Sequence, residues 1–127
     1  VIDPTDKDAV RSLLKSTGGG VAAAIDFVGA GPSFAFGFNA LRKGGKMVCV
    51  GLFGGSTPIS PAMVSMKVVT VAGSYVGSLE EMRELMEIAR SRALPALPIT
   101  MRPLARVSDA VQELRDGKVR GRIVVRP

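Results

Sequence analysis

The sequence predicts an α/β fold built around a parallel, doubly wound sheet. Strand patterns and helix patterns alternate along the chain, as they do when crossover helices join parallel strands. The strand segments are apolar without alternation, which is typical of strands buried on both faces. Glycine follows each of the first three strands, at the edge where such a sheet binds its ligands.

Residues 1–92 are expected to form the first domain, a β–α–β–α–β series preceded by a helix. That helix begins at Asp3-Pro4, because Asp3 can cap it and proline fits the first helical position. Gly18-Gly19-Gly20 ends it. The next elements are a strand at residues 21–28, a helix with Phe34, Phe38 and Leu41 on one side that ends at Gly44-Gly45, and strands at residues 47–50 and 68–72.

A further helix closes this series. Ser78 and Glu81 have the spacing of a capping box, which predicts that the helix begins there. Its apolar residues recur at helical spacing and lie on one face: Met82, Leu85, Met86 and Ala89.

Residues 93–127 are expected to form a separate segment. The composition changes near Ala93, and three prolines follow within a short stretch, so we expect the chain to leave the first sheet there. The predicted elements are an extended piece at residues 99–101, a helix with Val107, Ala110, Val111 and Leu114 on one face that ends at Gly117, and a strand at residues 123–125.

Histidine is absent from the 127 residues, and the one cysteine is Cys49. Zinc sites use Cys and His, and most acid–base catalysis at neutral pH uses His, so neither chemistry has its usual residues in this chain. A single cysteine also excludes an internal disulfide. Cys49 lies in a predicted apolar strand, which indicates a small core residue rather than a nucleophile.

The net charge of +6 is concentrated near the C-terminus, where residues 101–127 hold seven Lys or Arg against three Asp or Glu. Apolar helix and strand patterns continue between these charges, and no aromatic residue lies among them to stack on bases. We therefore expect a solvated basic face, or one that meets a phosphate, and no nucleic-acid partner.

The sequence also predicts no membrane partner. No apolar run approaches the ~18 residues of a membrane-spanning helix. Asp3, Asp6, Lys7 and Asp8 fill the region where a signal peptide would lie. A cytoplasmic location is therefore expected.

The candidate ligand-binding residues lie at the three strand ends, in residues 28–30, 51–55 and 73–77. Glycine at each end lets a flat ligand approach the backbone closely, whereas the alternative is that each glycine merely terminates its strand. No G-x-G-x-x-G opens a helix after a strand. The sequence thus predicts half of a nucleotide fold, without its phosphate loop.

Three further side chains are candidates. Asp26 lies inside an apolar strand, where a carboxylate needs a partner, so we expect a buried hydrogen-bonding role close to the ligand. Tyr75 can donate a proton, but no lysine lies four residues later, and a packing role is expected. Arg122, at the entry to the last strand, is either an ordinary surface arginine or a phosphate clamp.

With these residues in view, the chain resembles the zinc-containing alcohol dehydrogenases of the medium-chain dehydrogenase/reductase family over essentially its whole length. The resemblance implies the second half of a Rossmann NAD(P)-binding domain in residues 1–92 and a segment returning to the catalytic domain in residues 93–127. It is carried by short pieces that are specific through their order and spacing, at residues 1–4, 24–29, 41–45, 50–55, 72–77 and 117–122.

The resemblance also implies residues that bind the coenzyme, NAD or NADP. Val28 and Gly29 resemble residues that line its adenosine end. A second group is similar to the stretch whose backbone meets the nicotinamide carboxamide, and it comprises Val50, Gly51 and Leu52, with Phe53 beside them.

Two more contacts follow from the resemblance. Ser74, Tyr75 and Val76 resemble the second nicotinamide contact, and Arg122 resembles the arginine that reaches the coenzyme pyrophosphate. The strand around Val68–Ser74 is similar to the one that pairs across the dimer in this family, so a homo-oligomer is expected.

The implied activity is hydride transfer between an alcohol or aldehyde substrate and NAD(P), with zinc held by an adjoining domain. The first β–α–β half, the zinc ligands and the proton relay have no counterpart here, so no catalytic residue and no metal ligand is expected in this chain. It is interpreted as a fragment that is inactive alone. The alternatives are a zinc-free quinone or enoyl reductase of the same family, or a non-catalytic nucleotide-binding or interaction module.

Overall fold

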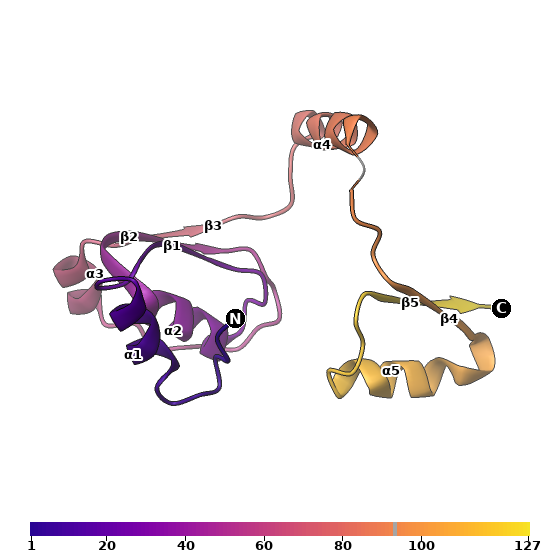
Figure 1. Ribbon diagram of the computed structural model, residues 1–127, viewed down its shortest axis with the longest axis horizontal. Helices are drawn as coiled ribbons and strands as arrows, with labels where there is room; N and C mark the ends of the chain where they lie inside the picture. The colour runs from indigo at the N-terminus through magenta and orange to yellow at the C-terminus, as the bar shows by residue number, and fades with distance from the viewer. Residues whose placement is uncertain (93) are drawn as a thin grey trace. The chain divides into compact units, whose positions relative to one another are not determined.

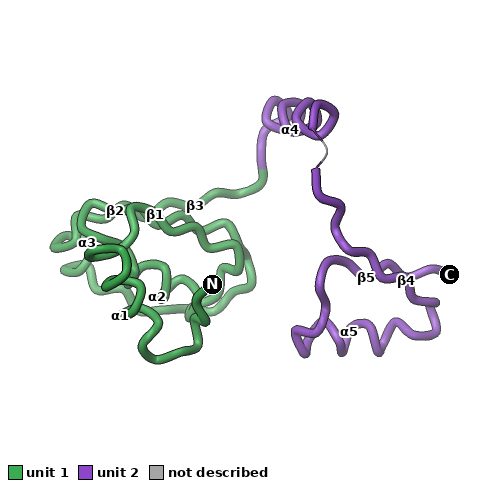
Figure 2. The backbone as a smooth tube through the Cα atoms, viewed as in Figure 1, with its two compact units in different colours: residues 1–76 green, residues 77–127 purple. Residues whose placement is uncertain are grey.

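The computed structural model describes residues 1–92 and 94–127, and the chain forms two compact units (Figures 1 and 2). The first unit is residues 1–76 and the second is residues 77–127. The division into compact units therefore falls 16 residues before the predicted boundary after residue 92. Which residues belong to a coenzyme domain and which to a catalytic domain stays a prediction.

The first unit is built on a parallel sheet of three strands in the order β1–β2–β3 (Figure 1). The register pairs Asp26 with Cys49 and Cys49 with Gly73. The carboxyl ends of the strands therefore lie level with one another, as the sequence predicts for a parallel α/β sheet. The strands are β1 (Val21–Asp26), β2 (Leu41–Cys49) and β3 (Thr70–Gly73).

Three helices accompany these strands, and they are α1 (Ala9–Ser16), α2 (Gly31–Ala40) and α3 (Pro61–Lys67). The core of the unit joins α2 to β2 and to the residue before β3: it consists of Phe38, Leu41, Met47 and Val69. Met47 is fully buried, and Gly37 makes room for it, because a Cβ at Gly37 would lie 3.0 Å from the Met47 sulfur.

Lys67 ties the end of α3 to the end of α2. Its ammonium group donates hydrogen bonds to the carbonyls of Phe38 and Asn39, at 3.1 and 3.3 Å. It also lies 5.5 Å from the centre of the Phe38 ring. A cation at a helix C-terminus satisfies free carbonyls and interacts favourably with the helix dipole, and burial lowers the pKa of the Lys67 ammonium.

One face of the sheet is covered within this unit and the other is open. Ala24 and Met47 lie on the face that α2 covers, where both approach Gly37. Ile25 lies on the opposite face, and it remains 58% exposed. The prediction that the strands are buried on both faces is therefore wrong for this unit by itself, because only one layer of helices packs on it.

Several predicted boundaries are also wrong. The first helix begins at Ala9 rather than at Pro4, because the Asp3 carboxylate accepts hydrogen bonds from both the backbone and the hydroxyl of Thr5 and so closes a turn there. Leu41 and Gly44-Gly45 belong to β2, since α2 ends at Ala40. Val68 is not in a strand, because it ends α3 in the left-handed conformation, with φ of 53°.

The second unit contains a helix and a small parallel β–α–β motif (Figure 1). The predicted capping box is confirmed, because Ser78 Oγ accepts from the Glu81 N–H and Glu81 Oε2 accepts from the Ser78 N–H. The elements are α4 (Leu79–Ser91), β4 (Ile99–Pro103), the 3₁₀ turn η1 (Leu104–Arg106), α5 (Val107–Arg115) and β5 (Arg122–Arg126), and β4 pairs with β5.

We expect Met47→Ala to lower the free energy of unfolding by about 2–5 kcal/mol, because it opens a cavity in the core of the first unit. The matched control is Met66→Ala in α3, where the side chain is 69% exposed and a loss below about 0.5 kcal/mol is expected. Urea unfolding of both variants checks this, and equal losses would contradict the assigned core.

Candidate functional site

The candidate site lies at the edge of the first unit where the three strands end. Asp26 ends β1, Cys49 ends β2 and Gly73 ends β3. The chain leaving β3 is held to β2, because the Ser74 N–H donates to the Cys49 carbonyl at 2.9 Å. The structure therefore brings together the predicted groups at residues 28–29, 50–53 and 74–76 on one edge of one sheet.

Asp26 ties the first two strand ends together through its main chain. Its carbonyl accepts hydrogen bonds from the N–H groups of Val50 and Gly51, at 2.9 and 3.0 Å. The next two bonds continue the pairing, since Phe53 N–H donates to the Val28 carbonyl and Gly54 N–H to the Gly29 carbonyl, both at 3.0 Å. Residues 28–29 and 50–54 consequently run side by side beyond the ends of their strands.

The Asp26 side chain fixes the turn that follows β1. It is 6% exposed, and Oδ1 accepts from the N–H groups of Val28 and Gly29 at 2.9 and 3.0 Å. Oδ2 accepts from the Ser33 hydroxyl at 2.9 Å. The sequence predicts such a buried hydrogen-bonding role for Asp26, but no sequence pattern identifies Ser33 as its partner. The available signal was the position of Ser33 in the first turn of α2, where its hydroxyl also accepts from the Ala30 N–H.

These contacts decide the ionisation of Asp26. Burial by itself raises the pKa of the carboxyl, whereas the hydrogen bonds from Gly29, Val28 and Ser33 lower it, and the net result is a pKa below the ordinary value. A carboxylate that accepts several hydrogen bonds is stabilised in its charged form. Asp26 is therefore an ionised acceptor at neutral pH and has no proton to donate as a general acid.

Gly29 and Gly51 are required by the packing of the chain on itself. A Cβ at Gly29 would lie 1.8 Å from the Gly51 carbonyl oxygen, and a Cβ at Gly51 would lie 2.1 Å from the Val28 carbonyl carbon. For this pair, contact between the two backbones explains the glycines, and the approach of a flat ligand is not needed to explain them. Gly54 and Gly73 differ, because a Cβ at either position would meet open space.

The side chains at this edge are apolar and exposed. Those of Leu52, Phe53, Tyr75 and Val76 are 74–84% exposed, and that of Val28 is 54% exposed. Val76 has φ of 50°, a left-handed conformation that costs a β-branched residue about 1–2 kcal/mol. Such local strain tends to concentrate at functional sites.

In the described residues, backbone groups without a hydrogen-bond partner are found on the second strand end and also on the third. Among the hydrogen bonds of residues 1–92 and 94–127, none reaches the Val50 carbonyl and none comes from the Leu52 N–H. The Val28 and Gly29 backbone groups are all satisfied within the chain. The edge therefore combines an apolar wall at residues 28–29 with free backbone groups at residues 50–52, among them the Val50 carbonyl and the Leu52 N–H.

A cavity of about 630 Å³ lies against β1 and α2. Asp26, Ser33 and Thr5 contribute its polar side chains, and all three hydrogen-bond within the chain. The remaining lining is mainly apolar and includes Ile25 and Phe36. The cavity therefore suits an apolar group rather than an anion.

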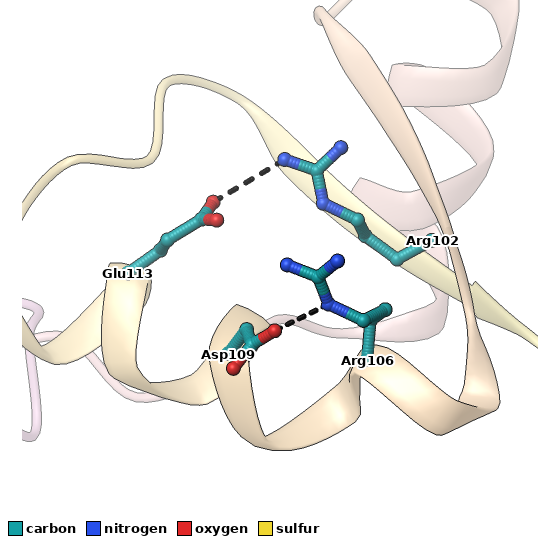
Figure 3. Close-up of polar contacts among 4 residues, drawn as sticks. All are labelled: Arg102, Arg106, Asp109 and Glu113. Carbon is teal, nitrogen blue, oxygen red and sulfur yellow. Dashed lines mark hydrogen bonds and ion pairs between the residues drawn. The ribbon is translucent and has the colours of Figure 1, made fainter.

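Arg122 lies in the second unit, as the first residue of β5, and is described there by itself. Three neighbouring cations are paired with carboxylates, namely Arg102 with Glu113, Arg106 with Asp109 and Lys118 with Asp116 (the first two in Figure 3). Among the described residues, Arg122 and Arg126 have no such ion pair. Part of the basic excess is thus neutralised locally, and β5 keeps two free guanidinium groups.

The described residues contain neither a cluster of metal ligands nor a long apolar helix. Within residues 1–92 and 94–127, no three His, Cys, Asp or Glu side chains group closely enough to hold a metal ion. In the same residues no helix has the length and apolar character needed to span a membrane. Cys49 is partly buried, and its thiol contacts the Gly51 carbonyl at 3.7 Å.

Comparisons with known proteins agree with this geometry. Residues 1–91 match the sequence model of a family described as zinc-binding dehydrogenase. An alcohol dehydrogenase of Moraxella sp. (strain TAE123) is 32% identical over 124 residues, which cover 98% of this chain and 36% of that protein. A NAD-dependent alcohol dehydrogenase of Sulfolobus acidocaldarius is 29% identical over 130 residues, covering 99% and 36%.

Solved structures give the same result. The alcohol dehydrogenase of the archaeon Aeropyrum pernix superposes with a TM-score of 0.80 at 30% identity, over 95% of this chain and 35% of that one. The predicted α/β class is therefore confirmed, and the fold matches the Rossmann-like coenzyme domain of alcohol dehydrogenases. This chain spans about a third of the length of these relatives.

We expect Gly29→Ala to cost more than about 4 kcal/mol of folding free energy, because the new methyl group collides with the Gly51 backbone. Gly44→Ala is the matched control. Both glycines have positive φ, +70° and +77°, but a Cβ at Gly44 meets nothing within 4 Å. The control should lose only the backbone strain of about 1–2 kcal/mol. Similar losses in urea unfolding would show that the contact between residues 29 and 51 is dispensable.

Proposed function

Because the chain belongs to the zinc-binding dehydrogenase family, we propose that it supplies the second half of the NAD(P)-binding domain of an alcohol dehydrogenase. The observation that carries this proposal is the shared edge of three parallel strand ends, with free backbone groups beside an apolar wall. Parallel α/β sheets bind their ligands outside the carboxyl ends of their strands.

The chemistry of this edge suits a nicotinamide coenzyme. A carboxamide offers both a donor and an acceptor, which match the free Val50 carbonyl and Leu52 N–H. The exposed side chains of Phe53 and Tyr75 offer apolar surface to a ring. Val28 and Gly29 form an apolar wall for the adenosine end, and Ser74 and Val76 complete the nicotinamide contact.

Arg122 is proposed to bind the coenzyme pyrophosphate. Its guanidinium group is free of carboxylate partners among the described residues. Arginine binds phosphate oxygens through charge-assisted, often bidentate hydrogen bonds. The coenzyme, when bound, supplies the hydride acceptor, and the residues of this chain bind and orient it.

Zinc is not held by this chain in the proposed enzyme. Its sequence has no histidine and one cysteine, and that thiol lies in the β2 strand against a carbonyl. These residues do not fit a zinc site of the kind built from three or four Cys, His or carboxylate ligands. The choice of NAD or NADP, the alcohol substrate and a zinc site are accordingly assigned to other parts of the enzyme.

The outer edge of β3 is proposed to pair with a second copy of the chain. β3 pairs with β2 on one side only, and Thr70, Val71 and Gly73 are exposed. An uncovered edge strand offers free N–H and C=O groups for pairing with another chain. This is the segment within Val68–Ser74 that the sequence predicts at a dimer interface.

We expect the enzyme that carries this chain to bind NADH or NADPH, and Arg122→Ala to weaken that binding by about 1.5–3 kcal/mol. Arg126→Ala is the matched control, because Arg126 lies on the same strand and is also exposed. Titration of the coenzyme fluorescence measures both dissociation constants. Equal weakening by the two substitutions would indicate general electrostatic attraction, and no weakening would remove Arg122 from the site.

A polypeptide of residues 1–127 alone is expected to show no dehydrogenase activity with primary or secondary alcohols, with or without added zinc. The reason is that these residues include no histidine and no set of zinc ligands. The measurement is NADH formation at 340 nm. Turnover above the rate without protein would refute the assignment of catalysis to other segments.

A further inference from the structure

We propose that Asp26 is a positioning residue for the coenzyme, because it holds the two backbone segments of the site, residues 28–29 and residues 50–54, in register. This inference rests on the proposed function. Its main-chain carbonyl binds the N–H groups of Val50 and Gly51. Its carboxylate binds those of Val28 and Gly29. One buried residue therefore fixes the start of both strand ends that face the ligand.

The Asp26 carboxylate also determines which groups the apolar wall at residues 28–29 exposes to a ligand. The two N–H groups of residues 28 and 29 are bound by Oδ1, and their carbonyls accept from Phe53 and Gly54, so these two residues have no unpaired backbone group to offer a ligand. Only the half-exposed Val28 side chain and the flat backbone face outward. The turn is thereby made into an apolar surface, which suits a ring rather than a phosphate.

The same carboxylate occupies the beginning of α2. A helix N-terminus normally attracts anions through its free N–H groups and its dipole. Here the negative group is already present, since Oδ2 binds the hydroxyl of Ser33 in the first turn of α2. The phosphates of the coenzyme are therefore directed away from this helix, in agreement with the absence of a phosphate loop from the sequence.

The geometry of the acceptor matters more than its charge in this arrangement. Asparagine has the same shape, keeps one oxygen for the two N–H groups, and can donate its amide to Ser33 Oγ. Alanine leaves two N–H groups in a buried turn without a partner. Glutamate keeps the charge but carries its oxygens one methylene further, so it cannot reach both N–H groups from the same backbone.

The experiment compares Asp26→Asn, Asp26→Ala and Asp26→Glu in the enzyme that carries this chain. We expect the dissociation constant for NADH to rise about ten-fold in Asp26→Ala, about five-fold or more in Asp26→Glu, and less than three-fold in Asp26→Asn. The KM for the coenzyme should follow these changes, whereas the KM for the alcohol and kcat at saturating coenzyme should change less than two-fold. If Asp26→Ala does not fold, the comparison of Asp26→Glu with Asp26→Asn tests the positioning role of Asp26.

Phe38→Leu is the control for loss of stability alone, because Phe38 is a core residue in the last turn of α2. At matched loss in thermal stability it should leave NADH binding within two-fold. Equal weakening by Phe38→Leu, or weaker binding in Asp26→Asn than in Asp26→Glu, would overturn the positioning role. Failure of the unsubstituted enzyme to bind NADH or NADPH would instead overturn the proposed function, and the inference with it.

Discussion

The contact between the turn after β1 and the chain after β2 is the constraint on which the first unit depends. The two segments approach so closely that neither Gly29 nor Gly51 has room for a Cβ. Hydrogen bonds from Val50 and Gly51 to the Asp26 carbonyl hold them in register. Because the two segments are fixed to each other, the edge where the strands end has a defined shape before any ligand arrives.

The core supports this edge from one side of the sheet. Met47 is fully buried on the covered face of β2, and Leu41 and Phe38 pack with it where α2 ends. Lys67 caps the same end of α2 and stacks on the Phe38 ring. The N-terminal end of α2 is held by Ser33 and Asp26 instead. Each end of this helix is therefore fixed by a separate polar contact, and its middle by apolar packing.

The apolar residues that remain exposed have a common cause. Ile25 lies on the sheet face that no helix of the first unit covers, and Met82 and Leu85 lie on α4 with about half of each side chain exposed. The apolar strand patterns are typical of a sheet covered on both faces. Under the proposed function, other segments of the alcohol dehydrogenase cover these surfaces.

Local patterns in the sequence suffice for the α/β class, for the strands and α-helices other than α3 (Pro61–Lys67), and for the capping box at Ser78, because these depend on periodicity and on contacts three residues apart. The sequence also singled out Asp26, since a carboxylate in an apolar strand needs partners. Three features are visible only in the tertiary structure. Ser33 is one of those partners, the backbones at Gly29 and Gly51 touch so closely that neither residue can carry a Cβ, and one sheet face is open. These features depend on contacts between segments, which no local pattern encodes.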